Sequence, residues 1–251
     1  MAHRLFVTGD THGDYDIGKL SSDRFDSRKL DKDDYLIIAG DFGLVFHPVQ
    51  STGREEYWLR WLAQKPFTTL FVDGNHENFD RLDEMPVEMW HGGRVHRIND
   101  SVLHLMRGEA FDIAGRKVFC MGGARSHDIE FRTEGESWWP QEMPDAEDRA
   151  HAWETLDAMT WKADLVITHC APANFQHALR ADYGNDEMTR FLFDVERKLE
   201  YGRWFFGHYH EDKEIGERAR AIYDDVVEVL TDGTVKKVSR PKKRLRPLKR
   251  V

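Results

Sequence analysis

The stretch Leu70-Phe71-Val72-Asp73-Gly74-Asn75-His76-Glu77 joins an apolar run to a cluster of polar residues. The run is short and rich in residues that favour β-structure, which predicts a buried strand. The strand ends at a glycine, and an amide and an imidazole follow, which are side chains able to bind a metal or to transfer a proton. A Gly-Asn-His-Glu tetrapeptide can also form a simple turn. Its meaning therefore depends on the rest of the chain.

Four other apolar runs end in polar residues in the same way. The five predicted strand ends carry Asp10-x-His12, Gly40-Asp41, Gly74-Asn75-His76-Glu77, His169 and Gly207-His208-x-His210. In α/β sheets, sites form at the carboxyl ends of the strands, so residues that are remote in sequence can converge there. We therefore expect these polar side chains to lie together.

The segments between these runs predict the fold class. Helical spacing of apolar residues is found in Glu55–Gln64, Ala146–Met159 and Asp186–Leu199. Four short runs between Val95 and Met121 predict an antiparallel meander, and Ala221–Glu228 and Thr234–Val238 predict two closing strands. Strands that alternate with helices, together with a meander, indicate an α/β protein with two packed sheets and helices outside.

The polar residues at the strand ends offer nitrogen and oxygen ligands. Such a mixed set suits divalent ions such as manganese, iron, nickel or zinc. Seven ligands are too many for one ion and suit two ions that share a carboxylate. Taken singly, Asp10 and Asp41 could cap helices, Asn75 could form a turn, and His169 could be a buried imidazole. Their joint position at strand ends favours metal binding.

In order and spacing, the motifs from Asp10 to His210 resemble those of the calcineurin-like metallophosphoesterase superfamily. The resemblance implies a four-layer α/β/β/α sandwich of two mixed sheets flanked by helices, and a centre with two divalent metal ions. It also implies how the ligands are shared. Asp10, His12 and His210 would hold one ion, Asn75, His169 and His208 the other, and Asp41 would bridge them.

The resemblance further implies a phosphoric ester hydrolase in which a metal-bridging hydroxide attacks phosphorus in line. Manganese is our first choice of metal, with iron, nickel or zinc as alternatives. His76 lies beside the ligand Asn75 in sequence, so we expect it to stabilise phosphoryl charge or to protonate the leaving oxygen. The expected enzyme is a phosphodiesterase or a nucleotide-directed phosphoesterase.

Two alternative functions remain open at this point. Protein phosphatases of the superfamily have a middle motif that resembles Gly-Asp-x-x-Asp-Arg-Gly, whereas this chain has Leu44 and Val45 where their Asp and Arg would stand. A Ser/Thr-type protein phosphatase therefore ranks second. A non-catalytic metal-binding scaffold of the same fold is the other alternative, and the complete ligand set argues against it.

A predicted insertion near residues 125–145 supplies candidates for substrate binding. Arg125 follows a Gly-Gly pair that would let a guanidinium approach phosphate oxygens, and Arg132 and Arg54 are alternatives. Trp138 and Trp139 could stack on a planar group such as a nucleobase, although burial within the insertion is the simpler explanation. A nucleotide or nucleic acid is thus one candidate substrate.

The formal charge of −9 is unevenly distributed. Residues 236–251 hold nine basic residues and no acid, so we expect a domain over residues 1–235, with a net charge of −18, followed by a basic tail. The tail could contact phosphate backbones or the acidic body. Two cysteines within apolar runs favour a reducing compartment, so we expect the cytoplasm. No apolar run approaches the roughly 20 residues that span a bilayer, and we expect no membrane association.

Overall fold

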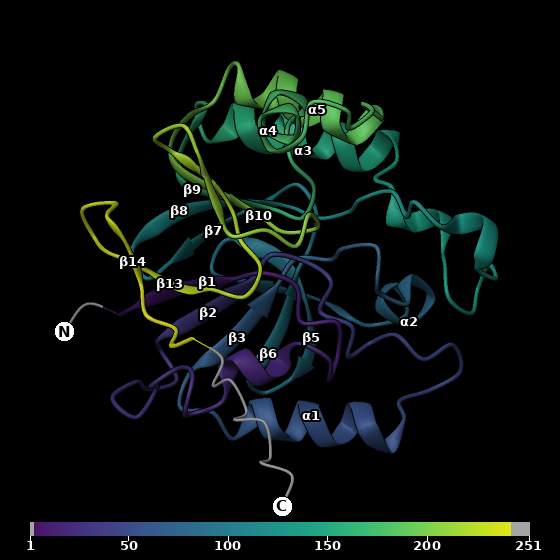
Figure 1. Cartoon of the computed structure of the whole chain (residues 1–251), viewed down its shortest axis with the longest axis vertical. Helices are drawn as coiled ribbons and strands as arrows, with labels where there is room; N and C mark the ends of the chain where they lie inside the picture. The colour runs from purple at the N-terminus through teal and green to yellow at the C-terminus, as the bar shows by residue number, and fades with distance from the viewer. Residues whose placement is uncertain (1–2, 242–251) are drawn as a thin grey trace, which may run out of the picture.

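Residues 3–241 are described by the structure, which is a computed structural model. Two β-sheets pack face to face, and helices cover both outer faces (Figure 1). This arrangement is the four-layer α/β/β/α sandwich that the sequence motifs imply.

The first sheet is mixed, with eight strands in the order β14-β13-β1-β2-β3-β6-β5-β4. Their bounds are β1 Leu5–Thr8, β2 Tyr35–Ile38, β3 Thr68–Phe71, β4 Val87–Trp90, β5 Gly93–Asn99, β6 Val102–Leu105, β13 Val226–Val229 and β14 Val235–Lys237. Strands β1, β2, β3 and β6 are parallel, and the others pair antiparallel. The carboxyl ends of the central strands therefore share one edge of the sheet.

The second sheet is also mixed, with six strands in the order β11-β12-β10-β9-β8-β7. Their bounds are β7 Glu109–Ile113, β8 Arg116–Met121, β9 Lys162–Thr168, β10 Glu200–Phe206, β11 Lys213–Ile215 and β12 Ala219–Ala221. Strands β8, β9, β10 and β12 are parallel, and the two edge strands are antiparallel.

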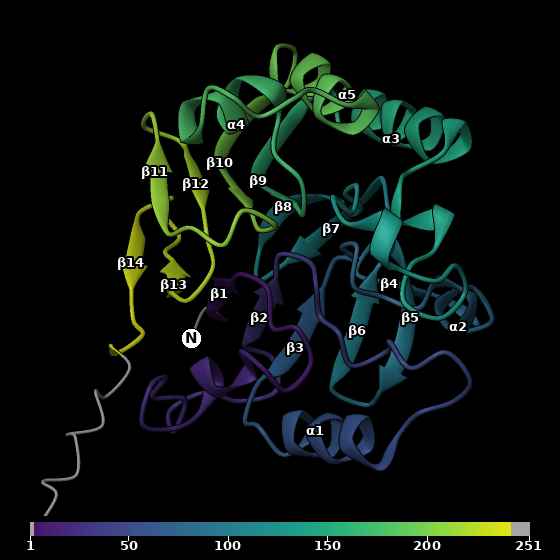
Figure 2. The ribbon, with the colours of Figure 1, turned by 45° about the vertical axis from the view of Figure 1, so that its right-hand side comes forward.

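Helices cover the outer faces of the two sheets. Their bounds are α1 Gly53–Ala63, α2 Phe79–Asp83, α3 Ala146–Ala158, α4 Ala173–Leu179 and α5 Glu187–Glu196. Figures 1 and 2 show α1 beneath the first sheet and α3, α4 and α5 above the second. The helix predicted over Glu55–Gln64 is α1. Thr52 caps its N-terminus: the Thr52 hydroxyl accepts from the backbone N–H of Glu55, and the Glu55 carboxylate accepts from the backbone N–H of Thr52.

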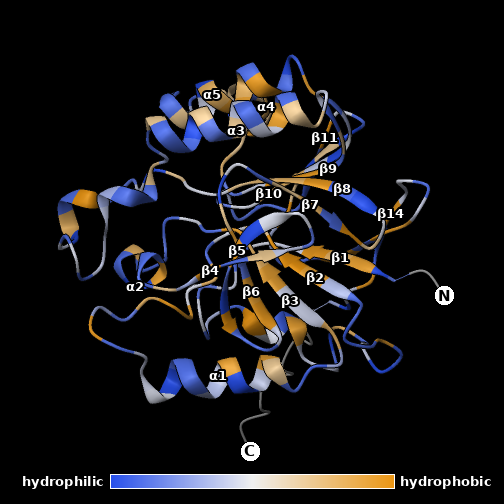
Figure 3. Cartoon of the chain, turned by 180° about the vertical axis from the view of Figure 1, so that it is seen from behind, coloured by the Kyte–Doolittle hydropathy of each residue, from blue (hydrophilic) through white to orange (hydrophobic). Residues whose placement is uncertain are grey.

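Three apolar layers hold the four structural layers together. Along β1, the side chain of Val7 packs between the two sheets, whereas its neighbour Phe6 packs in the cluster that contains Leu62 of α1. A third cluster joins the second sheet to helices α3, α4 and α5. Because the central strands are covered on both faces, β1 and β2 are mostly apolar and β10 ends in a fully buried apolar run, as their orange colour in Figure 3 shows.

The predicted antiparallel meander between Val95 and Met121 is wrong in one respect. Strands β5 and β6 form a hairpin in the first sheet, and β7 and β8 form another in the second, so the chain crosses between sheets at residues 106–108. Both hairpins are antiparallel internally, as expected. Strand alternation indicates which residues are buried, but both sheets bury residues against the same central layer, so the alternation does not identify the sheet.

The predicted closing pair is present as β13 and β14, which are antiparallel with a turn at Gly233. The first strand is shorter than predicted, because Ala221 ends β12 of the second sheet and β13 begins at Val226. Residues 236 and 237 of the predicted basic tail belong to β14, and residues 242–251 lie outside the described part of the chain. Within residues 3–241, no helix has the length and apolar character needed to cross a membrane.

Candidate metal centre

The five predicted strand ends meet at one edge of the sandwich. Asp10, Asp41 and Asn75 follow β1, β2 and β3 of the first sheet, and His169 and His208 follow β9 and β10 of the second. These strands run parallel within each sheet, so their carboxyl ends lie together. The fold therefore gathers residues that are up to 200 positions apart in sequence.

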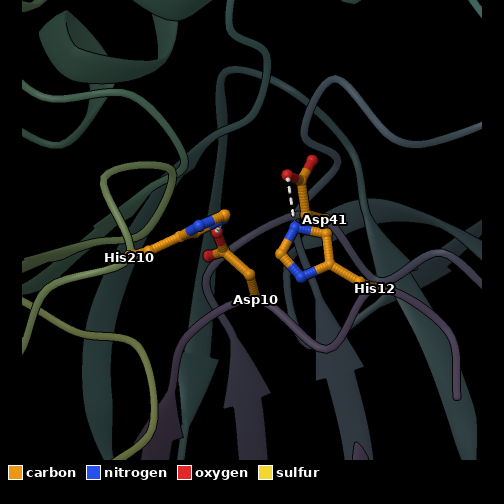
Figure 4. Close-up of side chains that lie close together, drawn as sticks. All are labelled: Asp10, His12, Asp41 and His210. Atoms are coloured by element: carbon orange, nitrogen blue, oxygen red, sulfur yellow. Dashed lines mark ion pairs between the residues drawn. The ribbon is translucent and has the colours of Figure 1, made fainter. Parts of the chain in front are cut away.

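Three of the gathered side chains lie close to the Asp41 carboxylate on the side of the site that faces a cavity. One ligand atom from each of Asp10, His12, Asp41 and His210 lies within 4.8 Å of the others, so the four could hold a metal ion (Figure 4). The Nε2 atom of His12 is 3.3 Å from Asp41 Oδ2, and the Nε2 atom of His210 is 3.3 Å from Asp10 Oδ2. We reserve the name open group for Asp10, His12 and His210.

The other three predicted ligands lie on the opposite side of Asp41, and we call them the enclosed group. The Nε2 atom of His169 is 3.2 Å from Asp41 Oδ1 and 3.3 Å from Asn75 Oδ1. The ring of His208 is centred 5.0 Å from that of His169. The two oxygens of Asp41 thus face two different groups of side chains. Asp41 Oδ1 also accepts from the backbone N–H groups of Asn75 and His76, at 2.8 and 3.0 Å.

The hydrogen bonds of two imidazoles fit metal binding. His12 Nδ1 lies 2.9 Å from Asp16 Oδ2, and His169 Nδ1 lies 2.8 Å from the carbonyl oxygen of Ala39. When Nδ1 donates to an oxygen, Nε2 can present its lone pair toward the centre, as it does in protein metal sites. The buried carboxylates Asp10 and Asp41 form ion pairs only with imidazoles among residues 3–241. The donor set therefore suits divalent ions that accept nitrogen and oxygen ligands.

The charges of the site follow from burial and from these contacts. Burial alone would lower the pKa of His12 and His169, but the Asp41 carboxylate raises them to about 9 and about 10. Burial would raise the pKa of Asp41, yet the neighbouring imidazoles, first among them His169, hold it well below its usual value. Burial and the charge of His169 lower the pKa of His208 to about 3. A proton and a divalent cation compete for the same Nε2 lone pairs.

The backbone at the site is strained. His12, Asp41, His208 and His210 all have positive φ angles, between 43° and 66°. Residues with a side chain rarely adopt this conformation unless the surrounding structure holds them there, and such residues cluster at functional sites. This conformation turns the side chains inward immediately after the strands end.

Glycines before the ligands are required by close packing. A Cβ atom at Gly74 would lie 2.1 Å from Asp41 Oδ1, and one at Gly207 would lie 2.2 Å from Asp10 Oδ1. No heavy atom fits at such a distance, so each carboxylate occupies the space that a side chain would take. The Gly-Asn and Gly-His pairs of the sequence therefore have a steric explanation.

His76 lies beside the open group, with its ring centred 5.3 Å from that of His12. Its Nε2 atom is 4.0 Å from Asp41 Oδ2 and 3.5 Å from Arg132 Nη2. Burial lowers the pKa of His76, the Asp41 charge opposes this effect, and the Arg132 charge adds to it. His76 also lines a cavity of about 780 Å³ together with His12, His210 and three aromatic residues, Tyr15, Phe46 and Tyr223.

The three candidate arginines lie in different surroundings. Arg125 is exposed at the start of the insertion. Arg132 is largely buried, paired with Asp128 at 2.7 Å and bonded to the carbonyl of Ser137. Arg54 lines the cavity and pairs with Asp14. Arg132 is thus the arginine whose guanidinium lies next to His76, although Arg125 was the first candidate from sequence.

Two further residues from the insertion occupy defined positions. Trp139 is buried, donates its indole N–H to Asp80 at 2.9 Å and packs edge-on against Phe46, which agrees with the simpler explanation of a packing role. His127 lies near the enclosed group, with its ring centred 5.6 Å from that of His208.

Several supporting residues were not identified from sequence. Lys19 is buried beneath the site and donates to the carbonyl oxygens of Asp10 and Tyr223. The Glu77 carboxylate accepts from the backbone of Phe42 at 2.6 Å and of Gly74 at 2.9 Å, so it ties two of the ligand loops together. Only Glu77 had a sequence signal, since it completes the Gly-Asn-His-Glu motif.

Comparison with known proteins gives a family match over most of the chain. A model of the family described as calcineurin-like phosphoesterase matches residues 3–212. All seven predicted ligands, His76 and Arg125 fall within this range.

Two curated proteins are similar to this chain at low sequence identity. The chain is 22% identical over 242 residues to a lariat debranching enzyme of Danio rerio, an alignment that covers 82% of this chain and 40% of that protein. It is 25% identical over 140 residues to a lariat debranching enzyme of Caenorhabditis briggsae, which covers 51% of this chain and 26% of that protein. The chain therefore spans less than half the length of these relatives.

Proposed function

The chain belongs to the calcineurin-like phosphoesterase family, and on that basis we propose that it is a phosphodiesterase whose centre holds two divalent metal ions. One observation carries the proposal. Asp41 turns one carboxylate oxygen toward His12 and the other toward His169, so a single buried carboxylate lies between two sets of ligands. This is the arrangement that a bridging ligand requires.

In this proposal, the open group and Asp41 hold one ion, and the enclosed group and Asp41 hold the other. Manganese is the first choice, with iron, nickel or zinc as alternatives that accept the same mixed ligands. Two ions held in this way would activate water at neutral pH and neutralise the phosphoryl oxygens during in-line displacement. The protein contributes the fixed positions of the ligands and a buried, low-dielectric setting.

His76 is the proposed catalytic residue. Its Nε2 atom faces the shared carboxylate from 4.0 Å, and the ring also lines the cavity beside the open group. A phosphoryl group at the centre would lie within reach of this nitrogen and of the Arg132 guanidinium, which can only donate hydrogen bonds. When Arg132 donates to the phosphate instead of to His76, a protonated Nε2 would deliver a proton or a hydrogen bond as the P–O bond breaks. Arg132 and Arg125 are the proposed partners of the non-bridging oxygens.

The cavity supports a diester substrate that carries a planar group. It has room for much more than a phosphate, and the rings of Tyr15, Phe46 and Tyr223 line it. Tyr15 is 82% exposed, so its ring is accessible to a group bound in the cavity. Nucleobases stack on such rings, and the debranching activity in the relatives' names points to RNA. We therefore propose a nucleic-acid-derived phosphodiester.

Leu44 argues against the protein phosphatase alternative. It stands where the phosphatase motif has the carboxylate that orients the catalytic histidine, and it is buried among apolar residues instead. His76 contacts the positively charged Arg132, whereas the catalytic histidine of the phosphatase motif would contact a negatively charged carboxylate.

Cys120 and Cys170 support the proposed location. Both are buried free thiols, and burial raises the pKa of Cys170 to about 12. Such thiols are unreactive and are typical of proteins in a reducing compartment, so we propose the cytoplasm.

The test combines metal analysis with a substrate panel. We expect two ions per chain after loading with manganese, and hydrolysis of bis(p-nitrophenyl) phosphate and of RNA dinucleotides in preference to monoesters and phosphopeptides. His76→Gln should lower kcat by about 100-fold or more for the dinucleotide, and less for the nitrophenyl ester, because nitrophenolate leaves without a proton. Bound metal without manganese-stimulated hydrolysis would support the scaffold alternative, and absence of bound metal would contradict the proposal.

A further inference from the structure

The side-chain amide of Asn75 must present one particular atom to the metal centre. Its oxygen can bind a cation, whereas its NH₂ group cannot, and the two have nearly the same size and shape. Asn75 Oδ1 lies 3.3 Å from His169 Nε2, on the side of the centre, and Asn75 Nδ2 donates to Ser126 Oγ at 3.2 Å on the other side. The contact with Ser126 therefore bears on which atom faces the centre.

Ser126 is itself held by a buried carboxylate. Its backbone N–H donates to Glu142 Oε1 at 2.7 Å, and its hydroxyl donates to Glu142 Oε2 at 2.7 Å. The residues Ser126 and Glu142 are 3% and 1% exposed, so water does not replace these bonds easily. Burial raises the pKa of Glu142, and the two hydrogen bonds from Ser126 oppose that rise by stabilising the ionised form, which can only accept hydrogen bonds. The single hydrogen of the Ser126 hydroxyl is thus committed to Glu142.

A hydroxyl whose hydrogen is committed can only accept from a further partner. The Ser126 oxygen must therefore meet a donor from Asn75, and the only donor on that side chain is the NH₂ group. The oxygen of the amide is then left to face the centre. From Glu142 through Ser126 to Asn75, each hydrogen bond fixes the direction of the next.

The same two residues close the base of the insertion. Glu142 accepts from the backbone of Ala124 through its own carbonyl oxygen at 3.1 Å, so residues 124 and 126 are both bound to it. The 15 residues between Ser126 and Glu142 include Arg132, Trp138 and Trp139. The insertion is thus anchored at the point where it contacts a proposed ligand.

We propose that Ser126 and Glu142 are positioning residues that hold the Asn75 oxygen toward the second metal ion. The inference rests on the proposed two-metal function. It gives this pair of residues a role in metal affinity that is separate from their part in holding the insertion.

The variant Glu142→Gln tests the direction of the hydrogen bonds with little change in volume. A glutamine that accepts from the Ser126 N–H with its oxygen presents its NH₂ group to the Ser126 hydroxyl, which then turns its hydrogen toward Asn75. The amide of Asn75 is thereby driven to rotate.

Ser126→Ala removes the acceptor altogether, and Ser126→Thr keeps the hydroxyl. Asp80→Ala is the matched control, because Asp80 anchors the insertion through Trp139 and does not touch Asn75.

The measurements are the manganese dissociation constants from calorimetry, the metal content after dialysis, and the melting temperature of the chelated protein. We expect Glu142→Gln and Ser126→Ala to weaken one of the two ions by about 10- to 100-fold, as is typical when a partner of a metal ligand is lost. Ser126→Thr and Asp80→Ala should stay within about threefold of wild type. Excess manganese should restore kcat in Glu142→Gln, which a purely structural defect would not allow.

Wild-type affinity for both ions in Glu142→Gln and Ser126→Ala would overturn the inference while leaving the proposed function intact. An equal loss in Asp80→Ala would also overturn it, because displacement of the insertion would then explain the effect. Fewer than two ions in the wild-type protein would overturn the proposed function, and the inference with it.

Discussion

The open group and the enclosed group offer similar ligands to Asp41 in different surroundings. The side chain of His210 is 51% exposed, whereas that of His169 is completely buried. His12 and His210 of the open group line the large cavity, whereas the described lining of that cavity includes no residue of the enclosed group. Two similar sets of candidate ligands thus differ in how deeply their histidines are buried.

The contacts that orient the imidazoles also differ between the two groups, and those of the open group are the more exposed. His12 is oriented by Asp16, which is partly exposed, and His210 stacks on Tyr223 at 4.7 Å. His169 is oriented by the backbone carbonyl of Ala39, which cannot change its protonation or its conformer independently of the chain. We therefore expect an ion in the enclosed group to exchange slowly and an ion in the open group to exchange faster and to meet the substrate.

Removal of the shared Asp41 carboxylate should weaken metal binding in both groups. We expect Asp41→Asn to lose both ions and to lower kcat/KM on the order of 1,000-fold, because the bridge and its charge are both removed. Asp16→Asn is the matched control, since Asp16 touches only His12 of the open group, and it should weaken one ion by about tenfold. Metal analysis and diester hydrolysis measure both effects. Equal losses in the two variants would contradict a bridging role for Asp41.

A matched pair of histidine variants should sharpen the comparison. In chelated protein, we expect His169→Ala to lower the free energy of unfolding by about 3 kcal/mol, because it removes the imidazole that pairs with buried Asp41 and that contacts Asn75 Oδ1. His210→Ala should cost less than about 1 kcal/mol, since its own side chain is half exposed and buried Asp10 keeps the His208 backbone N–H as a donor. Urea denaturation in the presence of a chelator measures both values. Equal costs would mean that depth does not distinguish the groups.

The convergence of the proposed ligands could be predicted from the sequence because each lies just after a strand that is buried on both faces. Such strands are short apolar runs, and a polar residue directly after one is conspicuous, as Asp10 is after β1. By contrast, β4 exposes Val87 and Met89 and has no apolar run, and it was missed. Helix α4 has seven residues, and it too was missed because it spans only two turns.

The supporting contacts could not be predicted, because they depend on where irregular segments return. Ser126 and Glu142 lie in a loop without periodicity, and neither residue type is unusual there. The same limitation applies to Arg132, which reaches His76 only because the insertion folds back across the site. The pattern of apolar residues in the sequence indicates where a strand ends, but the path of the following loop is set by tertiary packing.

The pH dependence of stability offers another way to examine the two groups. In chelated protein, the raised pKa values of His12 and His169, about 9 and about 10, contribute stability that is complete below pH 6.5. This contribution is lost as the pH rises through 9 and 10, because the folded state then releases protons that the unfolded chain has already lost. In the manganese-loaded protein the imidazoles bind metal and this dependence should disappear. Urea denaturation between pH 6 and 9.5 measures it, and a flat profile in chelated protein would contradict the assigned charges.

Substitution of the two arginines of the insertion should have the smallest effects on activity. These variants test which arginine binds the phosphate beside the open group. Arg132 is fixed by Asp128 and Ser137 next to His76, so it is already in place when a phosphoryl group arrives. We expect Arg132→Ala to lower kcat/KM about tenfold, the cost of one charged hydrogen bond. Arg125 is exposed and must be ordered on binding, so Arg125→Ala should raise KM about threefold and leave kcat unchanged. Steady-state kinetics on an RNA dinucleotide separates the two. The reverse ranking would show that the phosphate is held from the start of the insertion, near Ser126 and the enclosed group, rather than from beside His76.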